Sequence, residues 1–79
     1  MNERKNYLRE NTSNENVNRF TYHAPKGDQT VRYTAIRNDF HMLAESLCTD
    51  CPPSRELSLA LTNLEQACMW ANAAIARNE

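Results

Sequence analysis

The sequence has little of what several large classes of protein need. Its 79 residues carry a formal net charge of -1, so the basic excess of a general duplex-DNA binder is missing. No apolar run approaches the length of a membrane span, and the N-terminus has no apolar stretch of the signal-peptide kind. We therefore expect neither DNA nor a membrane as a partner.

Groups that perform catalysis are also scarce. Gly27 is the only glycine, which excludes a glycine-rich phosphate loop. A serine nucleophile needs a base such as histidine, and no serine has a histidine nearby in the sequence. No pair of carboxylates falls on the apolar helix faces described below. We expect no enzymatic activity and no cofactor.

The sequence has three cysteines, and an odd number argues against a disulfide framework. It suits an intracellular protein with reduced thiols. Cys48 and Cys51 form a C-x-x-C pair, but zinc would need two further ligands. His41 lies about 10 Å before the pair along a helix, and Cys68 lies roughly 20 Å beyond the following turn. A thioredoxin-like motif would need a strand before the pair and a helix beginning at it. We expect no metal and no redox role.

The first 19 residues form a polar leader. It holds six asparagines, and its only sizeable apolar groups are Tyr7, Leu8 and Val17. Such a segment cannot bury enough apolar surface to offset its ordering entropy. We predict a leader over residues 1–19 that is either frayed or a short helix, with a helical turn around Tyr7 and Leu8 as one form, and one folded domain over residues 20–79.

Two amphipathic helices are predicted in that domain. The first runs from about Asp28, as N-cap, to Cys48, and its apolar side chains recur at steps of three and four: Tyr33, Ile36, Phe40, Leu43 and Leu47. Two prolines in "CTDCPPS" then end it, and Ser54 is suited to cap a second helix from about Arg55 to Arg77. The apolar stripe of that helix comprises Leu57, Leu61, Leu64, Cys68, Ala71 and Ile75.

Two helices of about 20 residues joined by a short turn predict an all-α fold, an antiparallel two-helix hairpin. Met69 and Trp70 lie outside the stripe of the second helix, where a lone hairpin would leave them in water. An apolar patch of this kind usually marks a protein interface. We therefore expect a compact symmetric homo-oligomer. The alternative function is an adaptor that binds a host protein through the same face.

The stretch "FTYHAPKGDQ", residues 20–29, places aromatic and basic groups before the first helix. One interpretation is that its rings cover the apolar end of the hairpin while His23 and Lys26 are solvated. The other is a ligand site, because an aromatic ring stacks on any nucleobase and nearby cations bind phosphate. We favour the first interpretation for Phe20, and the ligand site for Tyr22 with His23 and Lys26.

Three arginines outside the apolar stripes are further candidates. Arg32 is interpreted as a surface charge on the first helix. Arg37 also lies on that helix, and Arg77 lies near the end of the second, where a cation suits the helix dipole. Both stay open as ligand contacts, since oligomerisation can gather copies of either around a symmetry axis.

Most of the domain resembles a known family. The runs "CPPSRELSLALTNLEQACMWANAAIARNE", "FTYHAP" and "RYTAIR" are similar to bacteriophage anti-CBASS proteins, which sequester the cyclic oligonucleotides of antiphage signalling. The resemblance covers residues 20–79 and leaves the leader out. A related hairpin domain occurs in nucleotide sponges that counter Thoeris defence. The resemblance implies sequestration, without degradation, of cyclic dinucleotides of the 3′,3′-cGAMP type and, in some members, of cyclic trinucleotides.

The resemblance also implies an assembly and a set of contacts. The family forms compact homohexamers, here in the cytoplasm of the infected bacterial host, with dinucleotide pockets between protomers and trinucleotide pockets where three protomers meet. Its base-stacking tyrosine corresponds to Tyr22, and its trinucleotide-binding arginine to Arg77. Its phosphate-binding residue corresponds to Arg37 or, alternatively, His41.

Overall fold

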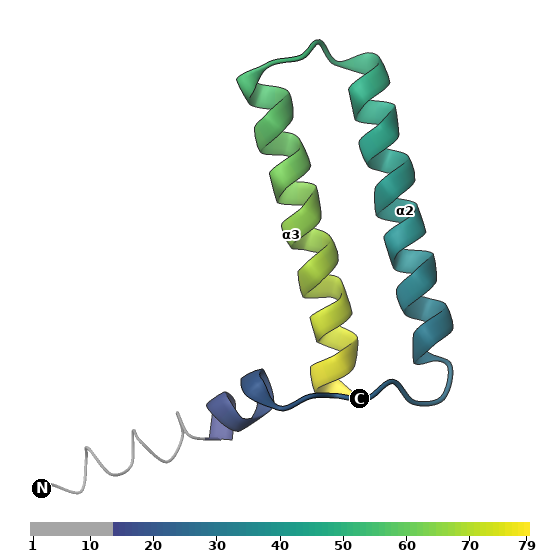
Figure 1. Ribbon diagram of the computed structural model, residues 1–79, viewed down its shortest axis with the longest axis vertical. Helices are drawn as coiled ribbons and strands as arrows, with labels where there is room; N and C mark the ends of the chain where they lie inside the picture. The colour runs from purple at the N-terminus through teal and green to yellow at the C-terminus, as the bar shows by residue number, and fades with distance from the viewer. Residues whose placement is uncertain (1–13) are drawn as a thin grey trace, which may run out of the picture.

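The fold is a long helical hairpin, seen in a computed structural model that describes residues 14–79 (Figure 1). Residues 14–20 are helical, and two long helices follow: α2, Gln29–Asp50, and α3, Arg55–Asn78. The long helices run antiparallel side by side, and the end of α3 returns to the segment before α2. The described part of the chain contains no strand, so the prediction of an all-α hairpin is confirmed for it.

The helix at residues 14–20 lies mostly in the predicted leader, for which a short helix was one of the two expected forms. The Arg19 side chain reaches back one turn, donating from Nη1 to Asn16 Oδ1 at 3.0 Å and lying 3.4 Å from Glu15 Oε2. Such pairs three and four residues apart support a short helix. The helical turn predicted around Tyr7 and Leu8 lies outside the described residues.

The start of α2 corrects one prediction. Asp28 occupies the N-cap position, but its side chain makes no capping hydrogen bond. Its backbone, at φ -87° and ψ 8°, is not in the extended conformation that aims a cap side chain at the first turn. Asp28 Oδ1 instead lies 3.1 Å from Arg32 Nη2, one turn into the helix.

The turn between the helices follows the sequence closely. α2 ends at Asp50, two residues beyond the predicted end at Cys48. The backbone N–H of Cys51, directly before the first proline, donates to Leu47 O at 2.9 Å. Ser54 Oγ accepts a hydrogen bond from Leu57 N at 3.1 Å, which confirms the predicted N-cap of α3.

The apolar faces of α2 and α3 meet along a half-open seam. All six residues of the predicted α3 stripe are half-buried, but on α2 Leu43 is 47% exposed and Ala44 is half-buried in its place. A straight helix drifts by about 20° per heptad against a seven-residue repeat, which turns Leu43 away from α3. No hydrophobic side chain within residues 14–79 is fully buried. One chain therefore leaves much of its apolar surface exposed to water.

Two further exposed apolar side chains belong to α3, one at the edge of this seam and one outside it. Trp70 is 66% exposed and Met69 is 64% exposed, as the sequence predicted for a single hairpin. Within residues 14–79, neither long helix is apolar enough over a sufficient length to cross a membrane.

Candidate functional site

Tyr22 lies at the open end of the hairpin, in the segment that leads into α2, and it is 82% exposed. Its two neighbours are held in place. Thr21 Oγ1 donates to Val17 O, and His23 Nε2 lies at hydrogen-bonding distance, 2.9 Å, from Asn18 O. The ring is thus exposed on a backbone anchored on both sides, which suits a contact with a partner or ligand.

Phe20 does not have the role that we favoured for it. Its ring is 84% exposed, so it does not cover the apolar end of the hairpin within the chain. Phe20 is the last residue of the short first helix, which extends away from the two long helices (Figure 1). Position along the chain placed it beside the hairpin, but the direction of that helix carries it outward.

A polar clasp closes the open end of the hairpin; it consists of Lys26, Gln29, Arg32 and Glu79. Lys26 Nζ donates to the main-chain O of Glu79 at 2.7 Å, and Gln29 Nε2 donates to Glu79 Oε1 at 3.2 Å. Arg32 donates from Nη1 and Nη2 to the two carboxylate oxygens of Glu79, at 2.8 and 2.5 Å. Two parallel bonds of this kind are among the stronger polar contacts in proteins. The clasp joins the end of α3 to the start of α2.

The clasp changes the interpretation of two cations. Arg32 is not a free surface charge, because it forms an ion pair with a residue 47 positions away in sequence. Lys26 is not merely solvated, since it is one of the two cations that hold Glu79. Gln29 is the one fully buried residue within residues 14–79, at 4% exposure, and its Oε1 also accepts from the backbone N–H of Lys26. The clasp therefore fixes Lys26, four residues after Tyr22, at the point where the start of α2 meets the end of α3.

The clasp has an electrostatic signature. Hydrogen bonds from Arg32 and then from Gln29 lower the pKa of Glu79 from its usual 4.5 to about 2. The same contact with Glu79 raises the pKa of Arg32 above its already high value. Because the pKa of Glu79 is lower in the folded state, its carboxylate stabilises the fold fully above pH 4.5. This stabilisation of the fold is lost as the pH falls toward 2.

The substitution Glu79→Gln is expected to lower the melting temperature at pH 7, because it removes the carboxylate charge that Arg32 binds. The difference from the unsubstituted chain should shrink between pH 4.5 and about pH 2, where the wild-type carboxylate becomes protonated. Circular dichroism melts across this range measure it, with Glu45→Gln, an exposed carboxylate outside the clasp, as the control. A difference that stays constant from pH 7 to pH 2 would contradict the role of the clasp.

Arg77 lies at the same end of the hairpin, on the outer surface of α3. Its guanidinium carbon lies over the Trp70 ring, 5.8 Å from the ring centre. Trp70 precedes Arg77 by seven residues on the same helix. A cation over an indole face is held by the charge distribution of the ring. Arg77 is half-buried and Trp70 is largely exposed, so both are available to a second molecule.

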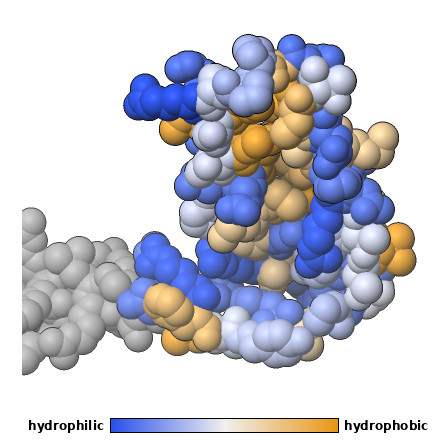
Figure 2. All heavy atoms as spheres, turned by 45° about the horizontal axis from the view of Figure 1, so that its top comes forward, coloured by the Kyte–Doolittle hydropathy of each residue, from blue (hydrophilic) through white to orange (hydrophobic). Residues whose placement is uncertain are grey.

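A groove of about 650 Å³ runs between α2 and α3. Figure 2 shows hydrophobic side chains gathered in the hollow between the helices, with hydrophilic ones along the rims. The lining residues come from both helices: Arg37, Phe40, His41, Ala44, Leu61, Leu64, Glu65, Cys68, Met69 and Asn72. Its volume lies within the range of small-molecule sites, about 300–1,000 Å³.

The structure divides the predicted ligand residues into two groups. Tyr22, His23 and Lys26 lie in the segment before α2, and Arg77 lies at the end of α3 that meets this segment. Arg37 instead lines the groove, eight residues or about 12 Å into α2. One chain therefore does not bring Arg37 to Tyr22.

Sequence reasoning missed two contributors to these regions. Asn72 lines the groove, although its only signal in the sequence is a polar residue between the apolar positions of α3. Glu79 gives no local signal at all, because its partners lie at the opposite end of the domain sequence. Within residues 14–79, no group of three or more histidine, cysteine and acidic residues is arranged to hold a metal ion.

Comparison with known proteins assigns the chain to a family. The family described as "Acb2/Tad1, hairpin domain" matches residues 13–76, which include α2 and nearly all of α3. No curated protein and no solved structure matches the chain. The family comprises the anti-CBASS and anti-Thoeris sponges, proteins that bind cyclic nucleotides and are not enzymes. Since the match covers most of the sequence, the chain belongs to the Acb2/Tad1 hairpin-domain family of nucleotide sponges.

Proposed function

We propose that this protein is a phage immune-evasion factor acting in the cytoplasm of the infected bacterial host. It binds cyclic dinucleotides of the 3′,3′-cGAMP type, and cyclic trinucleotides, without degrading them, and so blocks activation of CBASS effectors. The observation that carries the proposal is Tyr22, an aromatic ring 82% exposed on an anchored backbone in a chain of the sponge family. An exposed ring held in place is a stacking surface for a nucleobase.

The proposed binding unit is a symmetric homo-oligomer, a hexamer by the family resemblance. Two observations support more than one copy per site: no hydrophobic side chain within residues 14–79 is fully buried, and Arg37 lies apart from Tyr22 along α2. A 3′,3′-cyclic dinucleotide has nearly two-fold symmetry, which matches a pocket on a two-fold axis. In such a pocket Tyr22 stacks on a base while Arg37 of another copy contacts a phosphate.

Thermal melting tests the proposal most simply. A ligand that binds only the folded state stabilises it by mass action, by about 2.7 kcal/mol at a concentration of 100 times Kd. We expect 3′,3′-cGAMP to raise the melting temperature, while an equal concentration of GMP and AMP leaves it unchanged. If no cyclic di- or trinucleotide shifts the transition, the sponge assignment for this chain fails.

Arg77 is proposed to contact cyclic trinucleotides at a three-fold axis, where three copies supply three guanidinium groups. Arg77→Ala is then expected to weaken binding of a cyclic tri-AMP by at least about tenfold, because charge-assisted bonds to phosphate are lost. Binding of 3′,3′-cGAMP should change by less than about threefold. Calorimetric titration measures the affinity for both ligands. An equal loss of affinity for the two would contradict separate sites.

One observation favours the adaptor as the second candidate. Met69 and Trp70 remain largely exposed beside the groove and on the outer surface of α3, as a protein-binding face would be. The two functions separate in the melting experiment, because an adaptor gains no stability from a cyclic nucleotide.

A further inference from the structure

The clasp gathers cationic donors around one anion. Arg32 donates to both carboxylate oxygens of Glu79, and Gln29 Nε2 donates to one of them. Lys26 Nζ donates to the main-chain O of the same residue, which places a second positive charge near the carboxylate. Together these groups favour a negative charge at this position, and they hold the pKa of Glu79 at about 2. The clasp is therefore an anion site that the Glu79 carboxylate occupies.

The Glu79 side chain is placed where it can move away. Glu79 is the C-cap residue of α3, and its backbone N–H donates to Ile75 O at 3.2 Å. The last turn of a helix opens more readily than its interior. The side chains of Glu79 and Arg32 are 41% and 38% exposed, so solvent reaches the ion pair. Asp28 Oδ1, 3.1 Å from Arg32 Nη2, holds the guanidinium in place when Glu79 leaves.

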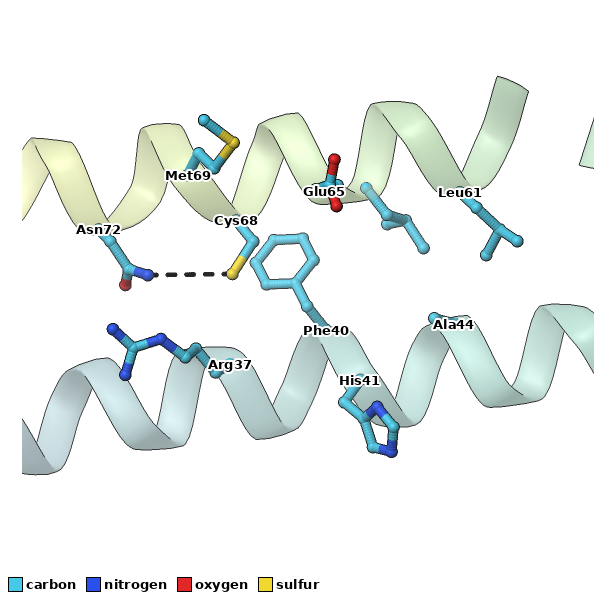
Figure 3. A pocket seen from close by; sticks show the side chains of 10 residues that line it. Arg37, Phe40, His41, Ala44, Leu61, Glu65, Cys68, Met69 and Asn72 are labelled. Atoms are coloured by element: carbon cyan, nitrogen blue, oxygen red, sulfur yellow. Dashed lines mark hydrogen bonds between the residues drawn. The ribbon is translucent and has the colours of Figure 1, made fainter. Parts of the chain in front are cut away.

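The anion site also lies close to Tyr22 along the chain. Tyr22 precedes Lys26 by four residues, so the two α carbons are at most about 14 Å apart. Arg37 instead lines the groove, where it lies across from Asn72 of α3 (Figure 3). A base that stacks on Tyr22 thus brings its phosphate toward the clasp of the same chain, and not toward Arg37 of that chain.

We propose that a phosphodiester of the bound cyclic nucleotide displaces the Glu79 carboxylate from Arg32 and binds between Arg32 and Lys26. The proposal rests on the proposed function. It adds Arg32 to the ligand contacts and makes Glu79 an internal competitor of the ligand.

A phosphodiester matches the group that it replaces. It carries one negative charge and two non-bridging oxygens, and a carboxylate likewise has one charge and two oxygens. A guanidinium binds either group through the same pair of parallel hydrogen bonds. The exchange therefore leaves the charge of the clasp unchanged. The two phosphodiesters of a cyclic dinucleotide offer oxygens both to the clasp of one copy and to Arg37 of another.

The test is calorimetric titration of 3′,3′-cGAMP into the unsubstituted protein and into Glu79→Gln, below both melting transitions. A competitor that occupies a site roughly nine-tenths of the time lowers the apparent affinity about tenfold. We expect Glu79→Gln to bind the ligand about three- to tenfold more tightly, although its melting temperature is lower. A clasp with a structural role alone gives no gain in affinity when it is weakened.

Two further variants show whether the gain comes from Arg32. Arg32→Gln should weaken binding by at least about fivefold, because a charge-assisted contact to phosphate is lost. In the Arg32→Gln background, Glu79→Gln should bring no further gain, since the competitor no longer has its partner. Glu15→Gln is the matched control for charge, because this exposed carboxylate pairs with Arg19 outside the clasp. It should change the affinity by less than about twofold.

The outcomes separate this proposal from the proposed function. If the unsubstituted protein binds no cyclic nucleotide, the sponge assignment itself fails. If it binds 3′,3′-cGAMP but Glu79→Gln brings no gain in affinity, the sponge assignment stands and the competitor role is refuted. An equal gain in Glu15→Gln also refutes it, because the effect is then one of net charge.

Nuclear magnetic resonance of the Glu79 carboxyl carbon tests the displacement without any substitution. At about pH 3 this carboxyl is ionised in the free chain, because its pKa there is about 2. Once displaced by the ligand, it should be mostly protonated, as expected for a carboxyl with its usual pKa of 4.5. A Glu79 carboxyl that stays ionised in the saturated complex would refute the displacement.

Discussion

Tyr22→Ala is expected to weaken binding of 3′,3′-cGAMP by between about fivefold and a hundredfold. Stacking of a base on an aromatic ring contributes about 1–3 kcal/mol, and each 1.4 kcal/mol is a factor of ten in affinity. Since the ring is 82% exposed in the free chain, its removal should leave the ligand-free melting temperature nearly unchanged. Isothermal titration calorimetry and a melt of the same sample measure the two effects.

The matched control for Tyr22 is Phe20. It is an aromatic residue two positions earlier with a similar exposure, 84%, but it ends the short first helix. Phe20→Ala should change the affinity by less than about threefold. If Phe20→Ala and Tyr22→Ala lower the affinity equally, the two rings act as general apolar surface and Tyr22 is not a specific stacking platform.

Trp70→Glu is expected to dissociate the proposed homo-oligomer. Buried tryptophans are among the residues whose loss costs an interface about 2 kcal/mol or more, and a symmetric assembly loses that amount in every copy. Size-exclusion chromatography with light scattering at about 10 μM should show an oligomer for the unsubstituted chain and a smaller species for the variant. The melting temperature should fall as well, because no hydrophobic side chain within residues 14–79 is fully buried in one chain.

Asn38→Glu serves as the control for Trp70→Glu, because it adds the same charge at an exposed polar position of α2. It should keep the oligomer intact. A wild-type chain that is monomeric at micromolar concentration, with a sharp melting transition, would contradict the assembly. In that case the exposed Trp70 face would need another partner, as an adaptor has.

The helices were predictable because their ends are marked locally. The prolines after Cys51 end α2, and the Ser54 hydroxyl caps α3, so both elements were placed to within two residues. The α3 stripe was correct at every position, whereas the α2 stripe was wrong at Leu43. A seven-residue repeat describes a supercoiled pair, and the drift of a straight helix over two heptads is enough to move one leucine out of contact.

The clasp was not predictable by the same reasoning. Asp28 was placed as a cap because aspartate favours that position, but its carboxylate pairs with Arg32 instead. The pairing of Arg32 with Glu79 spans 47 residues, and no local pattern indicates a contact over that distance. Such contacts depend on how the two helix ends meet, which follows from the length of each helix and the geometry of the turn.

The candidate ligand residues were identified by chemistry and by resemblance, and their arrangement was not. An exposed aromatic ring beside cations suggests nucleotide binding wherever it lies. That Arg37 lies about 12 Å along α2, in a groove with Asn72, depends on which helix face meets α3. The separation between the groove and Tyr22 suits a site shared between copies, which the family resemblance implied.

The most direct test of the proposed function is recovery of the ligand. The protein is mixed with one equivalent of 3′,3′-cGAMP per proposed site and passed through a filter that retains the protein. The retained sample is then denatured, and the released nucleotide is analysed by chromatography. We predict that the nucleotide stays with the folded protein and emerges intact after denaturation. Passage of the nucleotide through the filter, or release of a linear product, would contradict sequestration without degradation.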